Sequence, residues 1–431
     1  MIKNFLLLFV SIFYSLAIIY SEGQNRDAIY ELESSVIAII SCVCLFSYKN
    51  RPFSLYKVFY IFILFFFCLA PIIQYKDGFA MLGTVFSVNQ YREASFYVLL
   101  IIVLYNFLYR KFCSNRVNYT IKTCSYNLTT FKLILLLSIS LSVMFYYLYY
   151  NNFNLMSLLF RGGEFVDRIQ ISQVTFLLTS YFLRPITLII FLMSCQMRAT
   201  KVWVFIFGIL FLVSSPPTGM ARFSAAALYI PVLLYFFSFF RRKNVFVVLM
   251  FFGLLVVFPL LGNLRNFGKE EFQFSVMFEQ FKSLNFDSFS MLMRVLDADI
   301  VTWGKQLFGV LLFWIPRSLW PSKPIGSGSF IANENNLSFS NISMPYFGEA
   351  YINGGIIGIV LFLIFIAWFT AKEDNKYWIY ISRNENDINQ IKYFLILGLL
   401  MFILRGDLLS SFAYLCGFLS AFFMVKFLVS K

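Results

Sequence analysis

The run EAYINGGIIGIVLFLIFIAWFTA occupies residues 349–371 and begins with its only charged side chain, Glu349. Almost all of the residues that follow are apolar or small. A helix needs about 20 such residues to cross the hydrocarbon core of a bilayer. The run therefore predicts a membrane-spanning helix, and it places a carboxylate at one mouth of that helix.

The whole chain has the composition of a protein that crosses the membrane many times. Of its 431 residues, 60% are hydrophobic and only 13% are charged, and the mean hydropathy is +0.76. We predict an all-α polytopic fold of about twelve spanning helices, which forms a single integral-membrane domain over residues 1–431. The predicted spans are residues 4–20, 33–48, 56–74, 93–109, 132–150, 173–195, 202–216, 222–240, 244–262, 349–371, 391–405 and 407–425.

The distribution of positive charge predicts the orientation. More than half of the 35 lysines and arginines fall in segments that this topology places on one side, including the triplet Arg241–Arg242–Lys243. Cytoplasmic loops carry such an excess, so both termini are expected in the cytoplasm. The same rule explains the net charge of +14 without nucleic acid as a partner. The first run, Phe5 to Tyr20, lacks a small-x-small cleavage site and is expected to be a retained helix.

Histidine is absent and cysteine is sparse. Without histidine, mechanisms that use an imidazole base are excluded, as is the commonest zinc and haem ligand. The seven cysteines fall in predicted helices or cytoplasmic loops, so no disulfide framework is expected. We expect no metal site and no cofactor.

One large outside loop is predicted at residues 262–348. Within it, residues 271–300 alternate apolar and polar residues at helical spacing, which predicts one or two amphipathic helices lying on the membrane face. Residues 301–319 are apolar but are interrupted by glycine, lysine and proline, which favours an interfacial or re-entrant element over a span. Further along, Gly354 and Gly358 form a G-x-x-x-G pattern, which predicts a smooth helix face for close packing.

Arginines are the first candidates for chemistry. A planar guanidinium donates two parallel hydrogen bonds to phosphate and stays charged. Each single arginine could equally be an interfacial residue or part of a structural ion pair. Several arginines that fall outside the membrane or within a span stand out: Arg161, Arg168, Arg184, Arg222, Arg265, Arg317 and Arg405. Lys323 lies near Arg317 in the loop. Arg184 stands out because it lies in the middle of an apolar run.

Glu349 is the candidate general base. A partly desolvated carboxylate at the membrane mouth could accept a proton from a sugar hydroxyl. The alternative is a first-turn carboxylate that is stabilised by the dipole of its own helix. Asp407 is another acidic candidate, although it could simply pair with Arg405 two residues earlier.

Three segments resemble the O-antigen polymerases of Gram-negative bacteria and related oligosaccharide repeat-unit polymerases. They are WIPRSLWPSKP at residues 314–324, GEAYINGGIIG at 348–358 and LRGDLLSS at 404–411. The resemblance implies a glycosyltransferase of the bacterial inner membrane, with loop 262–348 in the periplasm. Such enzymes transfer an oligosaccharide chain from undecaprenyl diphosphate to a new lipid-linked repeat unit, without a nucleotide sugar. The resemblance also suggests a polysaccharide chain-length regulator as a partner.

The site that we predict on this basis combines arginines with one carboxylate. Glu349 would act as the catalytic base. The substrate-binding candidates for diphosphate and sugar are Arg317, Arg265, Arg161, Arg405, Lys323 and Arg222. No metal would be required, since arginines can neutralise a diphosphate. The absence of histidine argues against the related O-antigen ligases.

A lipid-linked oligosaccharide flippase is the alternative function. A flippase also has about twelve helices, but it needs buried cations on several helices around a central cavity. In this chain only Arg184 is deep in a predicted span, and no inverted repeat is evident.

Overall fold

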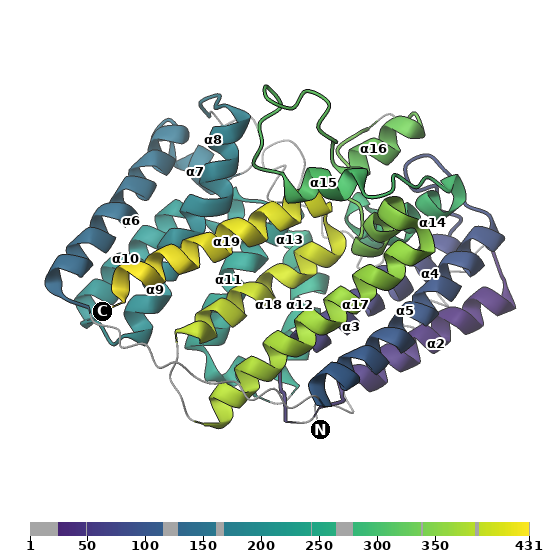
Figure 1. The fold of residues 1–431 in the computed structure, drawn as a ribbon, viewed down its shortest axis with the longest axis horizontal. Helices are drawn as coiled ribbons and strands as arrows, with labels where there is room; N and C mark the ends of the chain where they lie inside the picture. Colours follow the sequence, from purple (N-terminus) through teal and green to yellow (C-terminus); the bar gives the residue numbers. More distant parts are fainter. Residues whose placement is uncertain are drawn as a thin grey trace.

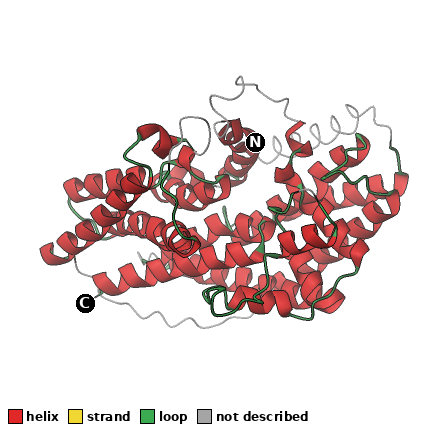
Figure 2. Cartoon of the chain, turned by 90° about the horizontal axis from the view of Figure 1, so that it is seen from above, coloured by secondary structure: helices red, strands yellow, loops and turns green. Residues whose placement is uncertain are grey.

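A computed structural model describes residues 25–48, 50–114, 128–160, 168–242, 244–263, 279–337, 339–383 and 388–430. Over these residues the chain is all helix and loop, without a β-strand (Figures 1 and 2). The all-α prediction is therefore confirmed for the described part. The α-helices are α2 (Ala28–Leu45), α3 (Leu55–Leu64), α4 (Ala70–Lys76), α5 (Val88–Ser114), α6 (Thr130–Tyr150), α7 (Leu155–Leu159), α8 (Gln173–Leu178), α9 (Arg184–Gln196), α10 (Lys201–Ser214), α11 (Arg222–Phe236), α12 (Val245–Phe252), α13 (Phe258–Asn263), α14 (Ser288–Ala298), α15 (Lys305–Leu311), α16 (Ser327–Glu334), α17 (Tyr346–Ser382), α18 (Asn389–Arg405) and α19 (Leu408–Val429).

Short π-helical turns join three pairs of these helices. The turns are η1 (Phe65–Leu69) between α3 and α4, η2 (Thr179–Leu183) between α8 and α9, and η5 (Gly253–Val257) between α12 and α13. A π-turn inserts a residue without ending the helix. Each pair therefore runs on as one apolar helix, as the long predicted spans require.

Eight helices in the described residues are long and apolar enough to cross a membrane. They are Ala28–Leu45, Leu55–Lys76, Val88–Ser114, Thr130–Tyr150, Thr175–Gln196, Lys201–Gly219, Tyr346–Ser382 and Leu408–Val429. The predicted spans at 222–240 and 244–262 correspond to shorter apolar helices, Arg222–Phe236 and Val245–Val257, and that at 391–405 corresponds to α18. The predicted span 4–20 lies outside the described residues. The total of twelve stays a prediction.

The helix Leu55–Lys76 forms the centre of the bundle, because it is buried along its whole length. Its sequence is apolar on every face, as a helix surrounded by other helices requires. Aromatic rings fill the contacts: the Phe59 and Tyr105 rings stack with centroids 3.7 Å apart. Helices α2, α17 and α18 pack around it.

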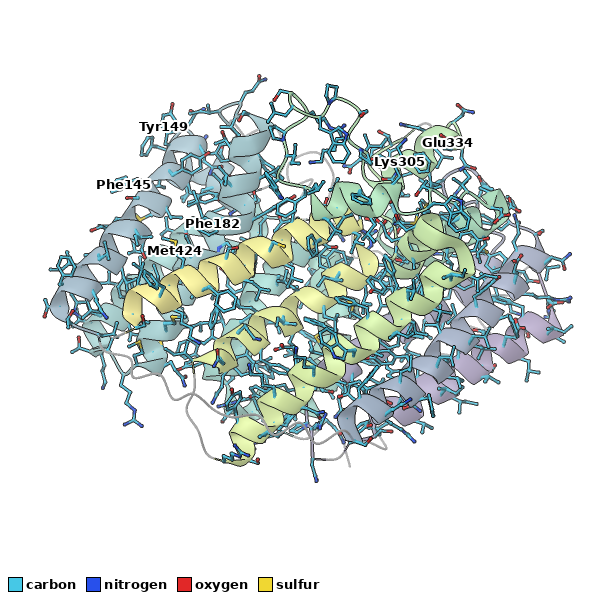
Figure 3. All side chains as sticks on the ribbon, in the orientation of Figure 1. Phe145, Tyr149, Phe182, Lys305, Glu334 and Met424 are labelled. Carbon is cyan, nitrogen blue, oxygen red and sulfur yellow. The ribbon has the colours of Figure 1, made fainter. Side chains whose placement is uncertain are left out.

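The peripheral helices have the opposite pattern. On α6, Phe131 is 75% exposed and Phe145 is 56% exposed. Figure 3 labels Phe145 on α6 and Met424 on α19, both at the outside of the bundle. Exposed apolar side chains along whole helices mark the surface that we interpret as lipid-facing.

The short helices α14, α15 and α16 lie together at one end of the bundle, which we call the α15 end (Figure 1). The prediction that 271–300 forms helices lying on the membrane face is wrong for the described part of this segment. Residues 288–296 of α14 are all buried, since α14 packs against α5 and α17. Residues 301–319 form no span: α15 has only 7 residues, and turns follow it.

A kink interrupts α17 close to the α15 end. Gly354 and Gly355 have non-helical backbone angles, and the φ of Gly355 is +59°. A side chain on Gly358 would clash with the Ala350 carbonyl oxygen, since its Cβ would lie 2.0 Å from that atom. The G-x-x-x-G pattern was predicted to give a smooth packing face, but these glycines instead allow a sharp bend. The bend separates the first two turns, which carry Glu349, from the apolar length of the helix.

At the other end of α17, Asp374 is fully buried in a dense hydrogen-bond cluster. Its Oδ1 accepts from the Leu55 backbone N–H at 2.9 Å and the Tyr393 hydroxyl at 2.6 Å. Its Oδ2 accepts from the Tyr56 backbone N–H at 3.2 Å and the Tyr109 hydroxyl at 2.6 Å. Asp374 thus satisfies the first backbone groups of α3 and ties this central helix to α5, α17 and α18.

Candidate active site

Two carboxylates meet at the α15 end. Glu349, in the first turn of α17, is 0% exposed. Its Oε2 accepts from the Ser327 hydroxyl at 2.6 Å, and its Oε1 accepts from the Leu408 backbone N–H at 2.8 Å. Glu349 therefore joins the starts of α16 and α19 as well as opening α17.

Asp407 lies next to it, at the N-cap of α19. Its Oδ1 accepts from the Leu409 N–H and its Oδ2 from the Gly328 N–H, both at 3.0 Å. Burial raises the pKa of the Asp407 carboxyl, although the surrounding backbone N–H groups lower it. A Cβ on Gly326 would lie 2.6 Å from Asp407 Oδ2, so glycine is required for this close approach.

The carboxylates of Glu349 and Asp407 accept hydrogen bonds from adjacent residues of the same two chain segments, 327–328 and 408–409. Among the described residues, no lysine or arginine forms an ion pair with either of them. Two neighbouring carboxylates without a cation cannot both ionise easily, and such pairs share one proton. The arrangement is suited to accepting and returning a proton.

A groove of about 460 Å³ lies beside this carboxylate pair. One wall is the face of α19 that begins with Leu409 and Ser410, directly after Asp407. Opposite are η2, with Tyr181 and Phe182, and the segment 313–317. Apart from Arg317, Lys323 and a few hydroxyls, the lining is largely apolar. The groove thus combines largely apolar walls with two cations, and neither carboxylate is among its lining residues.

Arg317 is exposed at the rim of the groove and Lys323 is buried beside it, and the two also fix the shape of the rim. Arg317 donates from Nη1 to the Lys323 carbonyl at 2.6 Å and from Nη2 to the Pro324 carbonyl at 3.1 Å. Lys323 donates from Nζ to the carbonyls of Phe313 at 2.6 Å and Ile315 at 2.9 Å. Burial, and then the nearby Arg317, lower the pKa of Lys323. The two cations hold residues 313–324 in a compact loop and leave positive charge at the groove.

Arg405 and Arg222 do not line this groove. Arg405 donates to the Ser343 hydroxyl and forms an ion pair with Asp287 at 3.0 Å. It therefore does not pair with Asp407, as its position two residues earlier had suggested. Arg222 donates to the Phe258 carbonyl at 3.2 Å and lies over the Phe258 ring. Both arginines have partners within the chain.

The predicted site residues are thus brought together only in part. Glu349, Arg317 and Lys323 lie at or beside the groove, whereas Arg405 and Arg222 lie elsewhere at this end of the bundle. Arg161 and Arg265 lie outside the described residues. No sequence pattern predicted that Asp407 lies beside Glu349. An aspartate directly before an apolar run is a helix N-cap signal, which could have located Asp407 but not Glu349 beside it.

Comparison of the chain with protein-family models, with curated proteins and with solved structures finds no match. The resemblance to O-antigen polymerases therefore depends on the three sequence segments quoted above. In the part of the chain that the structure describes, no group of three or more histidine, cysteine, aspartate or glutamate side chains could hold a metal ion.

Proposed function

We propose that the chain is a membrane glycosyltransferase of the O-antigen polymerase type. It would join undecaprenyl-diphosphate-linked oligosaccharide repeat units on the periplasmic face of a bacterial inner membrane. The observation that supports this most is the groove, which has largely apolar walls and two cations, Arg317 and Lys323, and whose α19 wall begins directly after Asp407, the neighbour of Glu349. A lipid diphosphate combines an apolar tail with a doubly phosphorylated head, and the groove offers a surface for each.

The cationic rim would stabilise the leaving group. When the bond between the sugar and the diphosphate breaks, negative charge grows on the diphosphate oxygens. Fixed positive charge at that position lowers the barrier, because it interacts more strongly with the transition state than with the substrate. Arg317, which is exposed at the rim, and Lys323 are the residues that would do this.

The carboxylate pair would accept the proton. The acceptor hydroxyl oxygen forms a bond to the anomeric carbon, the bond from that carbon to the diphosphate breaks, and the hydroxyl proton goes to a carboxylate. We assign this step to Asp407, because it lies at the start of the groove wall, and we assign to Glu349 the sharing of the proton. Glu349, predicted as the base, is enclosed by Ser327 and the Leu408 N–H, which favours this supporting role.

A flippase stays the second candidate, because Arg184 lies within the spanning helix Thr175–Gln196 and lines an internal cavity. Buried cations inside a bundle are also found in transporters of charged substrates. The two functions differ in one product: a polymerase forms glycosidic bonds, and a flippase forms none.

The test is reconstitution of the full chain in proteoliposomes with a defined undecaprenyl-diphosphate-linked repeat unit. The polymer ladder and the sidedness of the lipid-linked unit are both measured. The proposal expects a ladder that is lost with Asp407→Asn and shortened with Glu349→Gln or Arg317→Ala. Matched controls are Glu334→Gln and Lys305→Ala, which change exposed charges at the same end of the bundle (Figure 3). Movement of the lipid-linked unit without any ladder would contradict the polymerase and support the flippase.

A further inference from the structure

A second cavity lies across an aromatic partition from the groove. It has a volume of about 90 Å³ and is lined by residues of α6, η2, α9, α11 and α19 and by Arg168. Tyr181 lines the groove and Tyr414 lines the cavity, and their ring centroids are only 3.9 Å apart. The two spaces are therefore neighbours at the same end of α19.

Arg184 makes this cavity unusual. It belongs to the spanning helix Thr175–Gln196, and its guanidinium carbon lies 4.4 Å from the centroid of the Tyr147 ring. Its Nε is buried and has no hydrogen-bond partner in the described part of the chain. Within that same part, no acidic side chain forms an ion pair with it. A cation within a spanning segment is costly without a counter-charge, so an unpaired one points to a ligand.

The other lining groups suit the same kind of ligand. Arg168 brings a second guanidinium to the cavity and is held in place, with Nε donating to Asn151 Oδ1 at 3.1 Å and Nη2 to the Phe160 carbonyl at 2.7 Å. Ser224 and Tyr414 add hydroxyl groups. Guanidinium and hydroxyl donors around one space are the usual surroundings of a phosphate group.

We infer that this cavity binds a phosphate or diphosphate group, which supplies the counter-charge of Arg184. The volume is enough for a small anion or several water molecules, but not for an oligosaccharide. The assignment of the cavity to a lipid head group rests on the proposed function, in which donor and acceptor each carry a lipid diphosphate. The cavity would then hold one head group and the groove rim the other. The binding of phosphate itself does not depend on that function.

The experiment measures binding and thermal unfolding of the full chain in detergent, with two probes: inorganic pyrophosphate and a short-chain prenyl diphosphate. Arg184→Gln is expected to weaken binding about tenfold or more, because charge-assisted hydrogen bonds are lost. Arg184→Lys keeps the charge without the fork and is expected to give an intermediate loss. Lys305→Gln, a change at an exposed cation of the α15 end, should leave binding unchanged. Arg184-dependent binding of both probes would indicate a site for phosphate groups in general. Arg184-dependent binding of the prenyl diphosphate alone would indicate a site for the lipid head group.

Unfolding without a probe separates a ligand site from a structural role. If Arg184 has no counter-charge in the ligand-free protein, Arg184→Gln removes an uncompensated charge. The Tm of the ligand-free protein should then stay the same or rise. The inference is overturned if neither probe binds in an Arg184-dependent manner. It is also overturned if Arg184→Gln lowers the Tm in the absence of a probe, since the guanidinium would then already be satisfied within the chain. Absence of a polymer ladder with intact Arg184-dependent binding would refute the polymerase and leave this site standing.

Discussion

The two ends of α17 each bury a carboxylate, and their surroundings differ. Asp374 accepts four hydrogen bonds from two backbone N–H groups and two tyrosines. The Arg51 guanidinium, which donates to the Tyr109 hydroxyl at 3.1 Å, adds positive charge nearby. Among the described residues, Glu349 accepts two hydrogen bonds, from the Ser327 hydroxyl and the Leu408 backbone N–H, and its charged neighbour is Asp407, another carboxylate.

On this difference we interpret Asp374 as a structural carboxylate and propose a chemical role for Glu349 and Asp407. A buried charge contributes to stability when hydrogen bonds satisfy it fully, and Asp374 meets that condition. A pair of carboxylates without a cation lowers the stability of the folded protein. Such pairs are therefore found at sites where a proton is transferred. At the Glu349 end, the groove begins with Leu409 and Ser410, directly after Asp407, whereas Asp374 is enclosed by helices.

The largest expected effect is on turnover at the Glu349 end. The double variant Glu349→Gln/Asp407→Asn removes both proton acceptors, and we expect polymer formation to fall by roughly 10²–10⁴-fold. Its Tm should not fall, because two like charges are removed. The measurement is the polymer ladder per folded molecule, beside an unfolding curve. A variant that loses stability but keeps its turnover would reverse the roles that we assign to the two ends.

At the opposite end, Asp374→Ala should act on stability. The change leaves two backbone N–H groups of α3 and the hydroxyls of Tyr109 and Tyr393 without their acceptor. We expect a loss of about 3–5 kcal/mol in the free energy of unfolding. Thermal unfolding and the yield of folded protein measure it. Wild-type stability in this variant would show that Asp374 does not have the structural role that distinguishes it from Glu349.

A matched pair of single-donor variants sharpens the comparison. Tyr109→Phe removes one donor from Asp374, and we expect a loss of about 2 kcal/mol in unfolding free energy, with unchanged turnover per folded molecule. Ser327→Ala removes one donor from Glu349, and we expect less than about 1 kcal/mol of destabilisation, since a shared proton weakens the charge on the acceptor. Its turnover should fall about tenfold, because the proton-sharing geometry is disturbed. Equal effects of the two variants on both readouts would remove the distinction.

The smallest expected effect is on the pH dependence of stability. Burial raises the pKa of Asp407 above its ordinary value of 3.8. The folded state therefore binds this proton more tightly than the unfolded state does. The resulting stabilisation is complete below the unfolded pKa and is lost as the pH rises through the folded pKa. Asp407→Asn should lack this loss, as a comparison of unfolding curves between about pH 4 and about pH 7 would show. Parallel pH profiles for the variant and the wild type would mean that Asp407 is not perturbed.

The sequence predicted the helices well where apolarity decides them. The runs 56–74 and 132–150 correspond to Leu55–Lys76 and Thr130–Tyr150, because length and hydropathy are local properties. It predicted local chemistry less well: the glycines of α17 allow a bend, and no pattern shows which of them adopts a positive φ. It could not predict that Asp407 lies beside Glu349, since periodicity says nothing about contacts between residues 58 positions apart. The partners of Arg405 and Arg222 are also long-range.

The central helix has a consequence for biogenesis. Leu55–Lys76 is synthesised long before α17 and α18, two of the helices that cover it. Until then its polar groups lack their final partners: Gln74 donates to the carbonyl of Phe281 at 2.6 Å, more than 200 residues later in the chain. A nascent chain stalled before α17 would therefore present an incompletely covered helix to the insertion machinery or to membrane proteases. The cover of the central helix thus depends on helices that are synthesised long after it.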